Sequence, residues 1–227
     1  MMNDPVIEFK DATIFQGNVS VINNLTLKLD KGEFVYLLGK TGSGKTSLLK
    51  TIYGDIELKQ GTGEVSGFKL HSLKRKEIPY LRRKLGIVFQ DFQLLSDRTV
   101  FENLRFVMKA TGWNDETKIK SRIKDVLSKV GLESKEQVMP FQLSGGEQQR
   151  ISIARALINN PEIILADEPT GNLDPETSEE IMKLLLDISK QGRCILFATH
   201  DLLLYSKFPA RTLLCENNQI ADSTSLQ

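Results

Sequence analysis

One sequence feature constrains the fold more than any other: a glycine-rich loop that joins an apolar strand to a helix. The strand is predicted over residues 34–38 and the helix over residues 45–53. Glycines let backbone N–H groups converge on phosphate oxygens, and the helix N-terminus adds the positive end of its dipole. Lys45 is suited to the outer phosphates of a nucleotide, and the Thr46 hydroxyl is suited to Mg²⁺. The residues expected to bind the nucleotide are Gly39, Lys40, Thr41, Gly42, Ser43, Gly44, Lys45, Thr46 and Ser47.

A second apolar strand, predicted over residues 163–166, ends in two carboxylates, Asp167 and Glu168. Ligands of open α/β sheets bind at the carboxyl ends of the strands, so this end should face the glycine-rich loop. We expect Asp167 to bind Mg²⁺, directly or through water, and Glu168 to act as the general base on the attacking water. An acidic pair that merely ends a strand is the alternative, and the neighbouring phosphate loop favours the catalytic interpretation.

Alternating strands and helices predict an α/β fold. Further strands are predicted over residues 6–9, 25–29, 85–89, 194–198 and 212–215, and further helices over 100–111, 118–130, 145–159 and 175–190. The strands at 163–166 and 194–198 do not alternate with polar residues, which is typical of a parallel sheet covered on both faces. The strands before residue 30 and around residues 61–67 alternate more and carry glycine turns. They predict an antiparallel edge sheet.

The stretch from about residue 100 to residue 140 reads as successive helices with no convincing strand between them. It predicts a helical subdomain inserted into the α/β core. We therefore expect a single domain over residues 1–227. Its core would comprise about residues 1–90 and 160–227, and its helical subdomain about residues 91–159.

The composition excludes several classes of protein. Among 227 residues, 30 Lys and Arg face 29 Asp and Glu, and this net charge of +1 predicts no nucleic-acid partner. Two cysteines, Cys194 and Cys215, are too few for a disulfide framework. No apolar run approaches the roughly 18 residues of a spanning helix, and the acidic N-terminus predicts no signal peptide. Any membrane contact is therefore expected to run through a partner.

A second glycine motif precedes the helix predicted from residue 145. Ser144 and Glu147 have the spacing of a capping box, so a well-capped helix start is one explanation. Two consecutive glycines, Gly145 and Gly146, are a costly way to begin a helix unless something must approach the backbone closely. A second helix N-terminus of this kind suggests a phosphate that is contacted from two sides.

The string Leu-Ser-Gly-Gly-Glu-Gln at residues 143–148 resembles the signature of the ABC ATPases, and it is far more specific than a phosphate loop. Other matches stand in the family's order. Gln90 follows a strand at the position of the family's Q-loop glutamine, residues 172–174 match its D-loop, and His200 matches its switch histidine. The resemblance covers essentially the whole chain and implies a P-loop NTPase core of the ABC ATPase type.

The resemblance implies that the chain binds and hydrolyses ATP with Mg²⁺ as cofactor. His200 would contact the γ-phosphate, and Phe15 would stack on adenine, with core packing as the alternative for Phe15. The catalytic set would be Glu168, His200 and Gln90, and the metal ligands would be Thr46, Gln90 and Asp167.

The resemblance also implies a homodimer in which each ATP lies between two chains. Ser144, Gly145, Gly146, Glu147 and Asp174 of one chain would complete the site formed by the loop of the other. A membrane-spanning partner subunit would place the chain peripherally at the cytoplasmic face of the inner (plasma) membrane. The apolar residues Phe92, Leu94 and Leu95 would dock that partner, unless they pack inside the helical subdomain.

A narrower resemblance concerns residues 90–103 and the string Ala-Asp-Glu-Pro-Thr-Gly-Asn-Leu-Asp at residues 166–174. Both resemble the cell-division ATPases of this family, which act on cell-wall remodelling. An ATPase of a lipoprotein-release or macrolide exporter from the same branch is the first alternative. A soluble ABC ATPase acting on DNA or ribosomes is the second.

Overall fold

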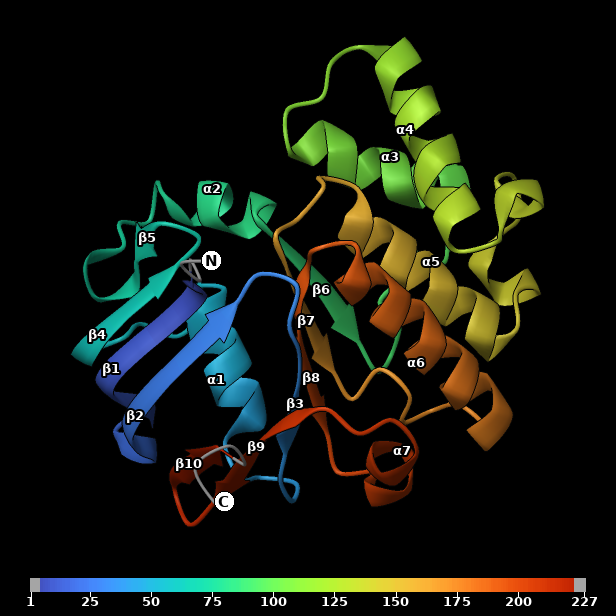
Figure 1. Ribbon diagram of the computed structural model, residues 1–227. Helices are drawn as coiled ribbons and strands as arrows, with labels where there is room; N and C mark the ends of the chain where they lie inside the picture. The colour runs from blue at the N-terminus through green and yellow to red at the C-terminus, as the bar shows by residue number, and fades with distance from the viewer. Residues whose placement is uncertain (1–4, 223–227) are drawn as a thin grey trace.

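A six-stranded sheet forms the centre of the computed structural model, which describes residues 5–222 (Figure 1). Its strand order is β10-β9-β3-β8-β7-β6. All neighbouring pairs are parallel except the edge pair β10 and β9. The strands are β3 (Phe34–Leu38), β6 (Leu85–Phe89), β7 (Ile163–Asp167), β8 (Cys194–Thr199), β9 (Arg211–Glu216) and β10 (Gln219–Asp222).

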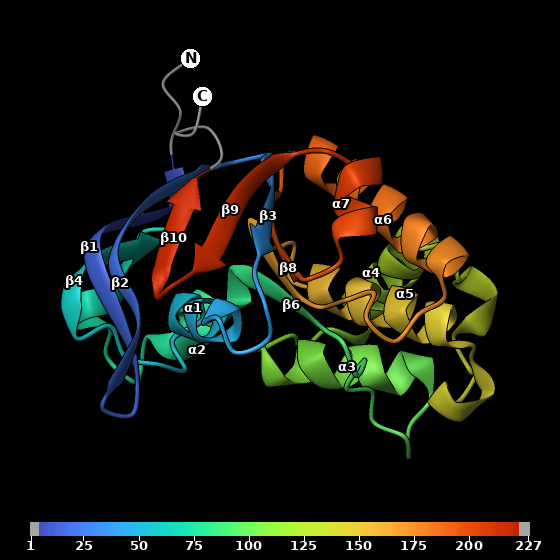
Figure 2. The same cartoon turned by 90° about the horizontal axis from the view of Figure 1, so that it is seen from below.

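A four-stranded antiparallel sheet lies beside it, with the order β2-β1-β4-β5. Its strands are β1 (Pro5–Gln16), β2 (Val19–Asp30), β4 (Gln60–Val65) and β5 (Phe68–Lys69). Helix α1 (Lys45–Ile52) lies between the two sheets, as both views show (Figures 1 and 2). Its buried Leu48 and Ile52 pack with Ile7 of β1 and Leu37 of β3 in one apolar core.

Helices cover the other face of the six-stranded sheet, where a second apolar core forms. Side chains of β3 alternate between the two cores: Val35 and Leu37 join α1, whereas Tyr36 packs against Phe197 of β8 at a ring distance of 5.6 Å. The remaining helices are α2 (Ile78–Arg83), α3 (Val100–Ala110), α4 (Glu116–Lys129), α5 (Gly145–Leu157), α6 (Pro175–Lys190) and α7 (Leu202–Lys207). In Figure 1, α3 and α4 stand apart from the sheet, while α5 and α6 lie along it.

The predicted fold class is confirmed, including the antiparallel edge sheet and the helical insertion. Strands β3 and β6 and helix α6 have the predicted bounds. Strands β1 and β2 are longer than predicted, because Asp11 and Asn24 adopt left-handed backbone conformations at irregularities that hide the alternation. The short helices α2 and α7 were not predicted, since six residues give too few turns for a periodic pattern.

The boundaries of the core and the helical subdomain stay a prediction. Helix α5 contacts β6 directly: a Cβ placed on Gly86 would lie 2.7 Å from the Ala156 carbonyl oxygen. The helix therefore packs against the sheet as well as against α3 and α4. Within residues 5–222, no helix is both long and apolar enough to span a bilayer. The extreme N-terminus, for which no signal peptide was expected, lies outside the described residues.

The parallel register determines where the loops meet. Leu38 pairs with Thr199, Asp167 pairs with Ala198, and Phe89 pairs with Asp167. The strands β3, β8, β7 and β6 consequently end at one edge of the sheet. The loops that follow them carry the glycine-rich segment, His200, Glu168 and Gln90 to that edge.

Candidate functional site

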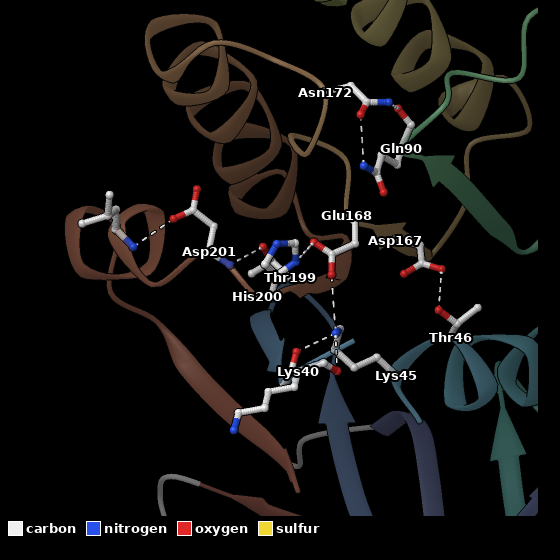
Figure 3. A network of polar contacts seen from close by, with 12 residues as sticks. Lys40, Lys45, Thr46, Gln90, Asp167, Glu168, Asn172, Thr199, His200 and Asp201 are labelled. Atoms are coloured by element: carbon white, nitrogen blue, oxygen red, sulfur yellow. Dashed lines mark hydrogen bonds and ion pairs between the residues drawn. The ribbon is translucent and has the colours of Figure 1, made fainter. Parts of the chain in front are cut away.

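Lys45 lies at the start of α1 with its side chain only 6% exposed. Its Nζ donates hydrogen bonds to the carbonyl oxygens of Gly39 at 2.6 Å and Lys40 at 3.3 Å, so the side chain folds back over the loop (Figure 3). Gly44 caps the helix with a φ of 107°, and a Cβ there would lie 3.1 Å from Ile22. Glycine therefore meets both the backbone conformation and the close packing at this position.

Glu168 lies between the loop lysine and the histidine of the neighbouring strand end (Figure 3). Its Oε1 is 3.4 Å from Lys45 Nζ, and its Oε2 is 2.9 Å from His200 Nδ1. The Glu168 backbone is left-handed at a φ of 50°, held by a hydrogen bond from its N–H to the Ala198 carbonyl oxygen. Such backbone strain is found where a side chain has to be held in a functional position.

Asp167 faces the first turn of α1, where Thr46 Oγ1 donates to its Oδ2 at 3.0 Å (Figure 3). Burial raises the pKa of Asp167 above its ordinary value, and the charge of Glu168 adds to that rise. The hydrogen bond from Thr46 and the charge of Lys45 partly oppose it. A divalent cation beside this carboxylate would favour its ionised form.

A cleft of about 1180 Å³ opens over these groups. The predicted site residues that line it are Phe15, Thr41, Gly42, Gly44, Lys45, Thr46, Ser47, Gln90, Asp167, Glu168 and His200. Phe15 is half-buried beside Val21, and its neighbour Ile14 takes the core position, so the Phe15 ring faces the cleft rather than the core. Ser43 Oγ within the loop is buried and has no hydrogen-bond partner among the described residues. Gly39, Lys40 and Ser43, which were also predicted to bind the nucleotide, do not line this cleft.

The donors near Asp167 fit Mg²⁺ better than a softer metal. Within residues 5–222, no group of three or more His, Cys, Asp or Glu side chains could hold a metal ion alone. Thr46 and Asp167 instead offer one hydroxyl and one carboxylate, and the amide of Gln90 lines the same cleft. Mg²⁺ commonly binds through one or two such oxygens together with phosphates and water.

Gln90 is held by a residue that the sequence did not single out for this task. Its Nε2 donates to Asn172 Oδ1 at 3.1 Å, and Asn172 Nδ2 donates back to the Gln90 carbonyl oxygen at 3.1 Å. A Cβ on Gly171 would lie 2.7 Å from Gln90 Nε2, so a larger residue there would displace the Gln90 amide. The loops after β6 and β7 are thereby joined (Figure 3).

The second glycine motif begins α5 with the predicted capping box. Ser144 Oγ accepts a hydrogen bond from the Glu147 N–H, and Glu147 Oε2 accepts one from the Ser144 N–H. A Cβ on Gly146 would lie 2.5 Å from Thr177 of α6, so one of the two glycines has a packing explanation within the chain. Asp174 caps α6, and hydrogen bonds from Thr177 lower its pKa.

None of Ser144, Gly145, Gly146, Glu147 and Asp174 lines the cleft beside the glycine-rich loop. One chain therefore brings together the phosphate loop, the carboxylates and His200, and leaves the second motif outside that site. The helices that carry the motif are joined to each other, because Arg150 of α5 forms a 2.8 Å ion pair with Glu180 of α6.

Sequence reasoning also missed Gln149, which is fully buried on α5. Its Nε2 donates to the carbonyl oxygens of Pro169 at 2.5 Å and Phe89 at 3.3 Å. Pro169 directly follows Glu168 and Phe89 directly precedes Gln90, so Gln149 contacts the backbone next to both site residues. The sequence did offer a sign of this role, because Gln149 falls on the apolar face of its helix. A buried side-chain amide needs hydrogen-bond partners, since leaving it unpaired is costly.

Comparison with known proteins agrees with this geometry. The sequence matches the family model described as ABC transporter over residues 22–171. The chain belongs to the ABC transporter family. The cell division ATP-binding protein FtsE of Streptococcus pneumoniae serotype 2 is 41% identical over 221 residues, which are 97% of this chain and 96% of that protein.

Two solved structures show the same fold. The dimeric structure of MJ0796, a bacterial ABC transporter cassette, has a TM-score of 0.81 and 34% identity, covering 94% of this chain and 96% of that one. The dimeric post-hydrolysis state of MJ0796, bound to ADP and Pi, has a TM-score of 0.83 and 33% identity, covering 96% and 97%. Hydrolysis of ATP is therefore the chemistry of this family member.

The raised pKa of Asp167 predicts a trade-off between stability and function. Because the folded chain binds this proton more tightly than the unfolded chain, ionised Asp167 lowers the free energy of unfolding at neutral pH. Asp167→Asn should therefore unfold at a higher urea concentration at pH 7. The advantage should shrink as the pH falls toward the ordinary aspartate range of about 3.9. Urea titrations without Mg²⁺ at several pH values would measure this, and lower stability at pH 7 would contradict it.

Proposed function

We propose that the chain is the ATP-hydrolysing subunit of a membrane complex, that it works as a homodimer, and that the complex serves cell division. The observation that carries the proposal is the Lys45–Glu168–His200 arrangement beside the glycine-rich loop. It provides a carboxylate between a cation and an imidazole, at the edge of the sheet where phosphates bind.

The roles of the residues follow from their positions. With the ATP phosphates on the loop N–H groups, Lys45 binds the outer phosphates and His200 lies beside the γ-phosphate. Glu168 takes a proton from water as the water oxygen attacks the γ-phosphorus. The bond to the β,γ-bridging oxygen breaks, and ADP and phosphate result. Phe15 stacks on adenine at the other end of the cleft.

Thr46, Asp167 and Gln90 are the three residues that would hold Mg²⁺. The ion would neutralise negative charge on the phosphates. Gln90 would offer its side-chain oxygen to the ion, whereas its Nε2 is bonded to Asn172 Oδ1. The hydrogen bonds between Gln90 and Asn172 connect Gln90 to the segment at residues 172–174, where Asp174 is expected to meet the other chain.

Exchange of the carboxylate for an amide tests the general base. Glu168→Gln keeps the shape of the side chain and removes the proton acceptor, so turnover should fall by about 10²–10⁴-fold while ATP binding persists. The variant should accumulate as an ATP-bound dimer in size-exclusion chromatography. Phosphate release measured at steady state decides the matter: a rate near that of the wild type would exclude Glu168 as the base.

The composite site is supported by the position of the second glycine motif outside the cleft of its own chain. The N-terminus of α5, with Ser144 exposed, offers backbone N–H groups that could donate hydrogen bonds to a phosphate bound to another chain. The related cassette MJ0796 was solved as a dimer, which supports a homodimer here. Each ATP would then lie between Lys45 of one chain and Ser144, Gly145, Gly146 and Glu147 of the other, and Asp174 would lie nearby.

Mixed dimers test the composite site. Ser144→Arg should place a bulky side chain against the nucleotide of the other chain and abolish hydrolysis, as should Lys45→Ala. A mixture should regain partial activity, because each heterodimer has both lesions in one site and an intact second site. Ser144→Ala is the control, since it loses the cap at a cost of about 1 kcal/mol without adding bulk. Normal hydrolysis by Ser144→Arg alone would exclude the arrangement.

A groove of about 620 Å³ between α2, α3 and α5 is the proposed contact with the membrane-spanning subunit. Exposed Leu95 and Phe106 line it, and Arg82 and Arg83 add positive charge. This suits a short amphipathic helix of the partner that presents apolar side chains and acidic groups or C-terminal carbonyls. Of the three apolar residues expected to dock the partner, Leu95 lines this groove. Leu94 packs partly against the helical core, and the docking role of Phe92 and Leu94 stays a prediction.

Charge in the groove should remove the partner. Phe106→Glu and Leu95→Glu should abolish co-purification of the membrane-spanning subunit while the melting temperature stays within a few degrees of the wild type. Leu214→Glu is the matched control, because Leu214 is an exposed apolar residue on β9 outside the groove. Pull-down from solubilised membranes measures the contact. Undiminished recovery with both groove variants would place the partner elsewhere.

The proposal of a cell-division role rests on the similarity to FtsE. The partner would be a permease like FtsX, and the complex would act on cell-wall remodelling from the cytoplasmic face of the inner (plasma) membrane. An exporter of lipoproteins or macrolides is the alternative within the branch. Mass identification of the membrane proteins that co-purify with the chain separates these functions. Recovery of DNA or ribosomes instead would contradict the expectation of no nucleic-acid partner.

A further inference from the structure

The loop that follows Gln90 contains two consecutive residues in a left-handed backbone conformation, and neither is glycine. Phe92 has a φ of 56° and Gln93 a φ of 50°. The Gln93 N–H also donates to the Asp91 carbonyl oxygen at 2.5 Å, which closes a very tight turn. L-residues disfavour this conformation, so the turn has to be held by contacts from outside the loop.

Arg155 of α5 provides those contacts. Its guanidinium donates to the carbonyl oxygens of both left-handed residues, at 2.8 Å for Phe92 and also to Gln93. The side chain approaches no carboxylate closely enough for an ion pair among the described residues, and burial lowers its pKa while the charge of Asp91 acts in the opposite sense. Arg155 is half-buried, so its hydrogen bonds to the two carbonyl oxygens replace part of the hydration that the guanidinium loses.

The position of Arg155 also matters for the site and for the groove. Arg155 lines the groove together with Gln93 and Leu95. At its other end, the same loop begins with Gln90, whose amide is bonded to Asn172. Arg155 therefore contacts the segment at residues 90–95. Gln93 and Leu95 of this segment line the groove, and Gln90 lines the nucleotide cleft.

We infer that Arg155 is a positioning residue: it holds the turn at residues 92–93 and thereby sets the position of Gln90 relative to the groove. The inference rests on the proposed function for the role of Gln90, but the conformation of the loop is independent of that role. Arg155 does not touch the nucleotide cleft and takes no chemical part in hydrolysis.

Restoring the turn without Arg155 separates positioning from ordinary packing. If Arg155 acts by holding a left-handed backbone, glycine at Gln93 should replace it, since glycine adopts that conformation without a steric penalty. The test compares Arg155→Met, the milder Arg155→Lys, and each of them combined with Gln93→Gly. Asn217→Gly is the matched control, because Asn217 is an exposed left-handed residue at a φ of 50° in the remote turn between β9 and β10.

The first readout needs no activity. Amide hydrogen exchange over residues 91–96 follows the Gln93 N–H and the Leu95 N–H, which donates to Asn103 Oδ1 at 2.8 Å. Arg155→Met should speed this exchange by about fivefold or more, and Arg155→Lys should speed it less. Gln93→Gly should reverse the change, and Asn217→Gly should not. Unchanged exchange in Arg155→Met, or equal reversal by both glycines, would overturn the inference.

The second readout is the balance of ATP binding and turnover. Arg155→Met should lower kcat by about tenfold or more with Mg²⁺ present and leave the affinity for ATP without Mg²⁺ nearly unchanged, because only Gln90 moves. Gln93→Gly should recover part of kcat. Equal losses of kcat and affinity without recovery would mean a purely structural role. If the wild-type chain hydrolyses no ATP, the proposed function fails, and the exchange experiment still decides the role of Arg155.

Discussion

The parallel alignment of β3, β8, β7 and β6 is the constraint on which the site depends. Because these strands end in register, their following loops begin at one edge, and residues more than 120 positions apart in the chain come within hydrogen-bonding distance. Apolar side chains on both faces hold this alignment, through α1 on one side and α5 and α6 on the other. The chemistry lies in loops, and the buried sheet makes their positions reproducible.

The electrostatics of the site show that function is favoured over stability there. Glu168 is held in a left-handed backbone conformation beside a nearly buried lysine, Asp167 is buried against its preference, and the Ser43 hydroxyl has no partner among the described residues. Each of these features is unfavourable for folding alone. Together they describe a surface arranged for a group that carries several negative charges and a divalent cation.

Much of the fold and of the site follows from the sequence, because the motifs are local. The strand at Phe34–Leu38, the loop after it and the carboxylates after Ile163–Asp167 are each contained in a few consecutive residues. What the sequence did not predict depends on distant contacts. The pairing of Gln90 with Asn172 and the buried amide of Gln149 involve residues 82 and 20 positions away from their partners, and no local pattern specifies them.

The second glycine motif and the segment after Gln90 show how packing and an expected binding role can overlap. The two glycines suggested a ligand, yet Gly146 also faces Thr177 closely, so one residue type can serve packing and binding together. Three apolar residues suggested one exposed cluster, but the left-handed turn at Phe92 reverses the chain and sends Leu94 toward the core and Leu95 toward the groove. Turns of this kind cannot be recognised when the residue concerned is not glycine.

The close contact between Gly146 and Thr177 has a mechanical consequence. The backbone of α5 at Gly146 packs against Thr177 of α6, and the ion pair between Arg150 and Glu180 connects the same two helices about one turn further along, so the two helix starts are coupled. Any displacement of one helix start is therefore a displacement of both. A neighbouring chain that contacts the N-termini of both α5 and α6 would therefore form or lose its contacts with the two helices together.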